Sequence, residues 1–252
     1  MRLQVFEWGY AEAPPVVCVH GATGHGLRFG QLAEECWARR FHVFAVDLRG
    51  HGRSGWQSPW TIETHIGDLL ETLDALGLRQ PDWVGHSFGG RLVVEVAAKT
   101  PERIRRAVLL DPAIQLPARV VDCAVAGEMR EPVWESVAAC FASRDDTDGA
   151  DEWRALADLE LQLDRLADGR LRRRTSQEAV RAIYRELATT PPPPEALTMP
   201  AQLVYAPAGG IVTDQQASAY GRDGVVAVPG GHMLMWSAFD KTAATVEEFL
   251  TS

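Results

Sequence analysis

Gly85-His86-Ser87-Phe88-Gly89 decides the fold, because it places a serine between two glycines where an apolar strand pattern gives way to an apolar helix pattern. The strand pattern covers residues 82–86, and the helix pattern runs from residue 89 to about residue 99. Small residues on both sides of the serine allow a sharp turn that exposes its hydroxyl, while the helix N-terminus favours developing negative charge. The stretch predicts an activated nucleophile at Ser87, although a plain strand-to-helix turn would also favour glycine.

Short apolar runs of the kind that form buried parallel strands recur along the chain. They cover residues 16–20, 41–46, 82–86, 106–111, 202–206 and 225–228. Helical patterns separate them, so the sequence predicts an α/β fold with a mostly parallel central sheet and helices on both faces. Three of the runs lead into glycine-rich turns, which are His20-Gly21-Ala22-Thr23-Gly24, Asp47-Leu48-Arg49-Gly50-His51-Gly52-Arg53-Ser54 and Gly230-Gly231-His232.

With these motifs in this order, the chain resembles the α/β-hydrolase fold family, which has an HG turn, a D-x-R-G-x-G-x-S loop, a G-x-S-x-G elbow and a late GH. The resemblance covers about residues 1–116 and 199–252. It implies an esterase- or lactonase-like member of the family, with the α/β-hydrolase fold and a helical cap insertion.

The insertion is predicted between residues 117 and 198, where the short apolar runs give way to charged segments. Apolar side chains recur there at helical spacing over residues 134–141, 156–166 and 180–187, and prolines bound the segment on both sides. We therefore divide the chain into a hydrolase core, residues 1–116 and 199–252, and a helical cap, residues 117–198. Every candidate catalytic group lies outside the cap, so we expect its removal to impair substrate use more than the chemistry.

Composition and charge narrow the class of partner. The 252 residues are 46% hydrophobic, which suits one α/β domain with an insertion. The formal net charge of −9 repels nucleic acid and anionic membrane surfaces, so we expect neither as a partner. We expect instead a small-molecule ester or lactone substrate and a monomer or homodimer.

The predictions for localisation, metal binding and disulfides rest on sequence patterns that this chain lacks. The first residues show no secretory signal pattern, and no stretch approaches the roughly 18 apolar residues of a spanning helix, which predicts a cytoplasmic protein. The four cysteines show no C-x-x-C spacing, so we expect neither a metal site nor structural disulfides. Arginine far outnumbers lysine, a bias typical of GC-rich bacteria.

His232 is the best candidate for the base that accepts the serine proton. It lies in a glycine loop after a predicted strand and before the final helical segment. In the resembled family the order is serine, acid, histidine, and every other histidine of this chain precedes Ser87. His86, next to the nucleophile, is expected to pack or hydrogen-bond locally.

The acid is where this chain departs from the family pattern. Most members carry it after the strand that here covers residues 202–206, at about the position of Gly209, and glycine cannot orient an imidazole. A minority uses the end of the earlier strand, where Asp111 lies, and catalytic groups gather at the carboxyl ends of parallel strands. We expect Asp111 to be the acid. Asp214 is the second choice because helix capping explains it, and a triad without an acid remains an alternative.

Backbone N–H groups are expected to form the oxyanion hole. Phe88 directly follows the nucleophile and supplies one, and the resemblance to the HG turn assigns the other to Ala22. Gly21 lets that backbone approach a substrate closely. Met233 and Trp236 follow the base and are candidate substrate contacts, with packing under the last helix as the alternative.

The leading hypothesis is a serine hydrolase that cleaves a small carboxylic ester or lactone through an acyl-enzyme intermediate, without a cofactor. A serine rather than an aspartate at the elbow argues against the dehalogenase and epoxide-hydrolase branches. The same groups could cleave a thioester, an amide or an activated carbon–carbon bond. A non-catalytic ligand-binding relative is the alternative from another class, which Gly209 supports and the joint presence of Ser87 and His232 opposes.

Overall fold

A seven-stranded sheet forms the centre of the computed structural model, which describes all residues from 1 to 252. The strand order is β1-β3-β2-β4-β5-β8-β9, and every neighbouring pair is parallel except β1 with β3. The strands are β1 Gln4–Trp8, β2 Pro15–Val19, β3 His42–Asp47, β4 Asp82–His86, β5 Ala107–Leu110, β8 Ala201–Tyr205 and β9 Gly224–Ala227. The mostly parallel sheet confirms the predicted fold class.

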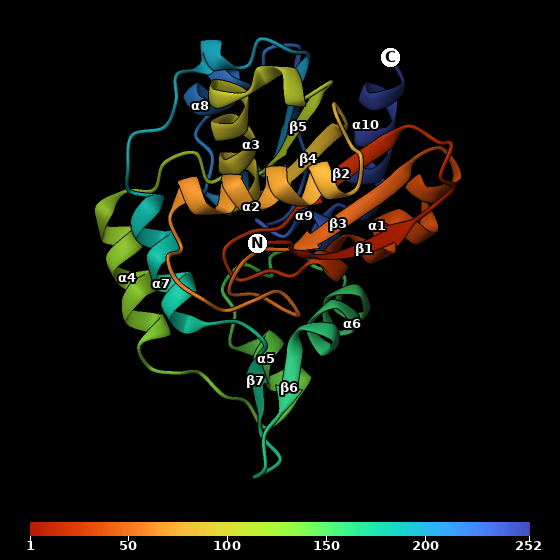
Figure 1. Ribbon diagram of the computed structural model, residues 1–252. Helices are drawn as coiled ribbons and strands as arrows, with labels where there is room; N and C mark the ends of the chain where they lie inside the picture. The colour runs from red at the N-terminus through yellow and green to blue at the C-terminus, as the bar shows by residue number, and fades with distance from the viewer.

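Helices cover both faces of this sheet, as Figure 1 shows. On one face pack α2, α3 and α8, and on the other pack α1, α9 and α10. Their bounds are α1 Gly30–Glu35, α2 Ile62–Ala75, α3 Phe88–Lys99, α8 Asp214–Tyr220, α9 Leu234–Ser237 and α10 Phe239–Thr251. The sheet is therefore the middle layer of three, and the catalytic candidates lie on the loops that leave it.

The alternation of side chains along β2 explains why the predicted strands are apolar throughout. Val17 and Val19 belong to the core cluster under α2 and α3, whereas Val16 and Cys18 belong to the cluster under α1 and α10. Successive side chains of a strand point to opposite faces, so a strand covered on both faces has no position for a polar residue facing water. Burial thus fixes the sheet and the position of every loop at its carboxyl edge.

The helices and the hairpin of the segment 117–198 lie below and to the left of the sheet in the view of Figure 1, and Val121, Ile183 and Leu187 share the core cluster of α2 and α3. It contains α4 Ala118–Glu128, α5 Val137–Ala142, α6 Glu152–Gln162, β6 Leu163–Arg165, β7 Leu171–Arg173 and α7 Gln177–Glu186. β6 and β7 pair as an antiparallel hairpin. The cap is therefore not wholly helical.

Two parts of the predicted helical spacing in the cap were wrong. α6 ends at Gln162, because Leu163 turns to an extended conformation and starts the hairpin. In the hairpin, Leu163 pairs with Arg173 and Leu171 pairs with Arg165, and both leucines are buried. The apolar residue at position 163, which suggested a longer helix, is therefore part of the hairpin. Trp134 lies outside α5 and forms an isolated bridge with Leu171.

Candidate active site

Ser87 occupies a strained turn between the end of β4 and the start of α3. Its backbone angles, φ 55° and ψ −117°, lie in a region that residues other than glycine rarely adopt. A Cβ on Gly85 would lie 2.5 Å from the carbonyl oxygen of Gly89, and one on Gly89 would lie 2.0 Å from that of Val19. The two glycines are therefore sterically required, and the elbow forms because only they permit it.

The HG turn lies directly against the nucleophile. A Cβ on Gly21 would lie 2.8 Å from Cβ of Ser87 and 3.2 Å from its Oγ. The neighbouring Ala22 has its carbonyl oxygen fixed by Nε2 of His51 at 2.8 Å, which orients this part of the turn. Phe88 starts α3, so its N–H has no partner within the helix. The HG turn and the elbow thus lie against each other, with Ala22 next to Gly21 in the chain and Phe88 next to Ser87.

His20 ties the HG turn to the loop that follows β3. Its Nδ1 donates to the carbonyl oxygen of Gly21 at 2.8 Å, and its Nε2 accepts from the N–H of Leu48 at 3.0 Å. Burial, followed by the neighbouring His51, lowers the pKa of His20 well below its ordinary value. The ring is neutral and needs one donor and one acceptor, and it has both.

Asp111 and His232 form the shortest side-chain contact of the site. Nδ1 of His232 lies 2.5 Å from Oδ2 of Asp111, which immediately follows β5 and has no exposed surface. The other carboxylate oxygen accepts from the N–H of Ala206 at 3.0 Å. Asp111 has a φ of 39°, so the backbone here is also strained. Both oxygens of Asp111 are engaged, and the carboxylate has a fixed direction toward the imidazole.

Asp214 has other partners. Its Oδ1 accepts from the hydroxyl of Tyr205 at 2.8 Å. It opens α8, but the cap of that helix is Thr213, which forms a capping box with Gln216. The capping explanation therefore named the wrong residue, and Asp214 gains a different structural contact.

Gly209 lies beside the histidine loop, and this explains why no side chain is present at the usual acid position. A Cβ there would lie 2.9 Å from the backbone nitrogen of His232 and 3.2 Å from its Cα. Backbone atoms cannot move aside as a flexible side chain can. In this chain the histidine loop occupies the space that a side chain at position 209 would need.

His86 is a site residue whose contact the sequence did not reveal. Its Nε2 donates to the backbone carbonyl of His232 at 3.0 Å, and the two rings lie 4.7 Å apart between centroids. Burial, followed by the charge of His232, lowers the pKa of His86 well below its ordinary value, so the ring is a neutral donor. Its position next to Ser87 was the available signal, because a residue at the end of β4 must face the loops at this edge of the sheet.

The candidate substrate contacts differ in their surroundings. Gly21 lies against Ser87, as described above. Met233 and Trp236 each expose 2% of their surface and belong to the core cluster under α1 and α10. Nε1 of Trp236 donates to Oδ2 of Asp158 in the cap at 3.2 Å. Their surroundings match the alternative of core packing.

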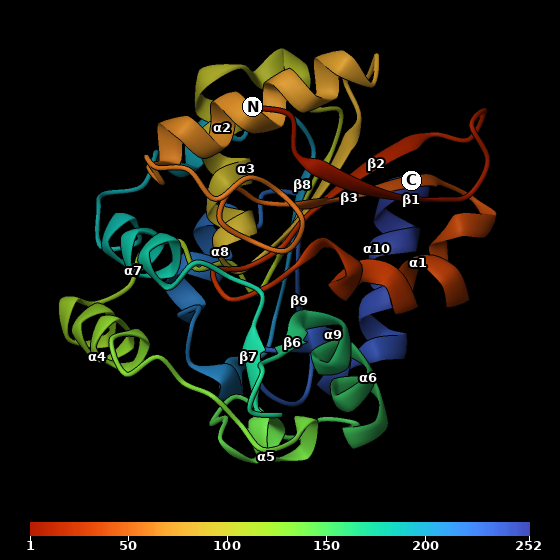
Figure 2. The same cartoon turned by 60° about the horizontal axis from the view of Figure 1, so that its bottom comes forward.

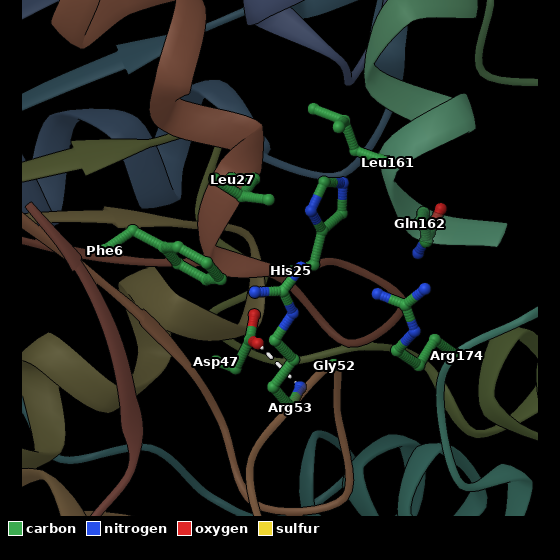
Figure 3. A pocket seen from close by; sticks show the side chains of 9 residues that line it. All are labelled: Phe6, His25, Leu27, Asp47, Gly52, Arg53, Leu161, Gln162 and Arg174. Carbon is green, nitrogen blue, oxygen red and sulfur yellow. Dashed lines mark hydrogen bonds between the residues drawn. The ribbon is translucent and has the colours of Figure 1, made fainter. Parts of the chain in front are cut away.

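A small pocket at the seam between core and cap lies away from these groups. Figure 3 shows its lining, which includes His25, Asp47 and Arg53 from the core and Leu161, Gln162 and Arg174 from the cap. Its volume of about 10 Å³ has room for about one water molecule. Neither Ser87 nor His232 lines it. The pocket is therefore away from the proposed reacting groups, and its volume is too small for an ester.

Known proteins match this arrangement of elements and motifs. The family described as alpha/beta hydrolase fold matches residues 14–239. The chain belongs to the α/β-hydrolase fold family. This hydrolase-fold chain is 34% identical over 222 residues to lipase LipV of Mycobacterium tuberculosis, which covers 86% of the chain and 84% of the lipase. Over 97 residues it is 33% identical to esterase YbfF of Escherichia coli, which is 38% of each protein.

Solved structures share the whole fold at lower sequence identity. The E-2-(acetamidomethylene)succinate hydrolase superimposes with a TM-score of 0.87 and 24% identity over 99% of this chain and 95% of that one. The enol-lactonase from Burkholderia xenovorans gives 0.83 and 23% over 99% and 96%. These likenesses confirm the α/β-hydrolase fold. None of the helices of this hydrolase-fold chain is both long and apolar enough to cross a membrane.

Proposed function

We propose that this protein is a serine hydrolase that cleaves a small carboxylic ester or lactone. The observation that carries the proposal is the 2.5 Å contact between Nδ1 of His232 and Oδ2 of Asp111. A carboxylate that accepts from Nδ1–H leaves Nε2 unprotonated and able to accept the proton of a serine hydroxyl. The strained elbow that presents Ser87 supports the same assignment.

The reaction follows from these roles. Ser87 Oγ attacks the ester carbonyl carbon and transfers its proton to His232, while the amides of Phe88 and Ala22 stabilise the oxyanion. The tetrahedral intermediate collapses to an acyl-enzyme, and the imidazolium returns the proton to the leaving alkoxide, which stays attached to the acyl group in a lactone. His232 then deprotonates a water molecule, which attacks the carbonyl carbon of the acyl-enzyme. When the acid is released, His232 returns this proton to Ser87.

A small-molecule substrate suits these surroundings. Ser87 exposes 8% of its surface, and we propose that residues 117–198 cover it as a cap. The chain itself supplies the nucleophile, base, acid and oxyanion donors, so this mechanism calls for no cofactor. A lipase and an esterase among the relatives support an ester as the bond cleaved.

The alternative of a non-catalytic binding protein rested on Gly209. That support weakens because Asp111 contacts the imidazole that an acid at position 209 would have oriented. Hydrolysis of a thioester, an amide or a carbon–carbon bond would use the same groups, so it differs in substrate rather than in machinery.

Labelling with a small fluorophosphonate and turnover of p-nitrophenyl esters of increasing chain length test the proposal together. We expect wild-type protein to label rapidly and hydrolyse short esters, and Ser87→Ala to do neither while keeping its fold, because alanine removes the nucleophile and little volume. An Ser87→Ala variant that retains more than a few per cent of the activity would contradict the assignment. Aryl and aliphatic lactones assayed alongside define the preferred bond.

A further inference from the structure

Asp158 is a buried carboxylate in the cap that the proposed reaction does not use. It lies on α6 and exposes 5% of its surface. Oδ1 lies 2.8 Å from Nε2 of His25, and Oδ2 accepts from Nε of Arg28 at 3.0 Å and from Nε1 of Trp236 at 3.2 Å. Burial alone would raise the pKa of Asp158, but Arg28 and His25 hold this pKa well below its usual range. The carboxylate is therefore charged at neutral pH and depends on all three partners.

These partners lie in or directly after the two core loops that carry the proposed oxyanion donor and the base: His25 ends the HG loop, Arg28 lies in the short 3-10 helix that follows it, and Trp236 follows the loop of His232. A tight turn, in which the N–H of Gly24 donates to the carbonyl of Gly21 at 2.9 Å, connects Ala22 to His25. Trp236 lies in α9, directly after the loop of His232. Figure 2 shows α6 beside α9, as their contacts also indicate. One cap carboxylate thus joins the two loops that flank Ser87.

The segment that leads into α6 holds the same histidine loop through its backbone. The N–H of Gly231 donates to the carbonyl of Asp148 at 2.8 Å, and the N–H of Asp151 donates to the carbonyl of Trp236 at 2.8 Å. These bonds lie on either side of His232 along the chain. The side chain of Asp151 also caps α6, so the segment and the helix form one unit.

Trp236 is the centre of this contact between cap and core. The guanidinium carbons of Arg144 and Arg28 lie 5.0 and 5.6 Å from the centroid of its ring. Cations at this distance from an indole attract it, in addition to the hydrogen bond to Asp158. The ring is therefore held by charged groups as well as by packing.

We infer that Asp158 is a positioning residue: by docking α6 against Trp236 and against His25 and Arg28, it fixes the loop of His232 and the HG turn relative to Ser87. The inference rests on the proposed function for its effect on turnover. Asp158 touches none of the proposed reacting atoms, so its loss displaces the base instead of removing a reacting group. Misplacement by about 1 Å from a distant change can cost about 10²-fold in rate.

Asp158→Asn tests this inference, because it keeps the volume of the side chain and removes its charge. We expect kcat on a p-nitrophenyl ester to fall by about 10²-fold with a much smaller change in KM. The amides of residues 230–237 should exchange with deuterium faster than in the wild type. Asp164→Asn is the matched control, since Asp164 is a half-exposed carboxylate on the hairpin strand β6 that pairs with Arg174, directly after β7, and both readouts should stay unchanged.

Trp236→Phe tests whether Asp158 acts on the loop of His232 through its hydrogen bond to Trp236 or through a general loss of stability. It keeps an aromatic ring in the core and removes the Nε1–H donor together with part of the indole, and the other two partners of Asp158 stay in place, so we expect a smaller fall in kcat than in Asp158→Asn. Because both changes act on the same contact between Asp158 and Trp236, the double variant should match Asp158→Asn within about twofold, whereas independent effects would multiply. Multiplying effects would overturn the inference.

Wild-type kcat and wild-type exchange over residues 230–237 in folded Asp158→Asn would also overturn it. If Asp158→Asn does not fold, exchange in Trp236→Phe decides instead, and unchanged protection of the loop in that variant rejects the inference. Exchange is measured without substrate. A wild type that neither labels nor hydrolyses esters would therefore defeat the proposed function and leave the test of loop positioning intact.

Discussion

Nδ1 of His232 lies 2.5 Å from Oδ2 of Asp111, although the two residues are 121 positions apart in the chain. β5 and β8 are adjacent in the sheet, and the N–H of Ala206, just after β8, donates to the other oxygen of Asp111. The carboxylate is therefore aligned by the sheet itself and needs no long loop to reach the imidazole.

Asp111→Asn should lower kcat by about 10⁴-fold, because an amide in place of the carboxylate stabilises the wrong imidazole tautomer. Asp214→Asn is the matched control, and its kcat should stay within a few-fold of the wild type because its partner is the hydroxyl of Tyr205. Both variants are assayed on one ester at one pH. A crippled Asp214→Asn beside an active Asp111→Asn would move the acid to the later loop.

Gly209→Ala should lower kcat by roughly tenfold or more, because the new Cβ would lie 2.9 Å from the nitrogen of His232 and must push the loop away. Gly67→Ala in α2 is the control, since a Cβ there meets nothing within 4 Å and alanine favours a helix. Steady-state kinetics and thermal unfolding of both variants check this. Full activity of Gly209→Ala would mean that the histidine loop tolerates displacement.

The sheet and the elbow could be predicted because local rules determine them. β2 to β5, β8 and β9 are apolar runs, four of which lead into glycine-rich turns, and their predicted bounds differ from the observed ones by at most one residue. β1 escaped notice because it is an edge strand, half-buried along its length, and its pattern resembles an ordinary polar terminus. Its place is set by pairing with β3, a contact that lies outside the segment itself.

The contacts around His232 could be predicted only in part. Strand order and position pointed to Asp111, but nothing local indicates that His86 donates to the backbone of residue 232 or that Asp158 in the cap reaches Trp236. Both contacts join segments that are far apart in the chain and depend on how the cap docks. Charged residues on an amphipathic helix look alike in sequence whether they face water or a buried partner.

Lowering the pH should reduce the free energy of unfolding of the wild type more than that of the Asp158→Asn variant. An aspartate in the unfolded chain titrates near pH 3.9, whereas Arg28 and His25, against the opposing effect of burial, hold the pKa of folded Asp158 below that value. The unfolded state then binds the proton more readily, so the stabilisation is complete above about pH 4 and is lost as the pH falls further. Urea unfolding between about pH 5 and 3 measures the slopes, and equal slopes in the two proteins would contradict the expectation.

Replacing residues 117–198 with a short linker should slow the labelling of Ser87 by a small fluorophosphonate, even though that reagent needs no cap to bind. The cap donates no proposed catalytic group, which by itself predicts intact chemistry. However, the carbonyl of Asp148 and the N–H of Asp151 hold the loop of His232 on both sides, and the deletion removes both bonds. Labelling rate per folded molecule, measured beside a variant that shortens only the hairpin connection at residues 166–170, separates the two expectations. Wild-type labelling in the full deletion would show that the histidine loop keeps its place without the cap.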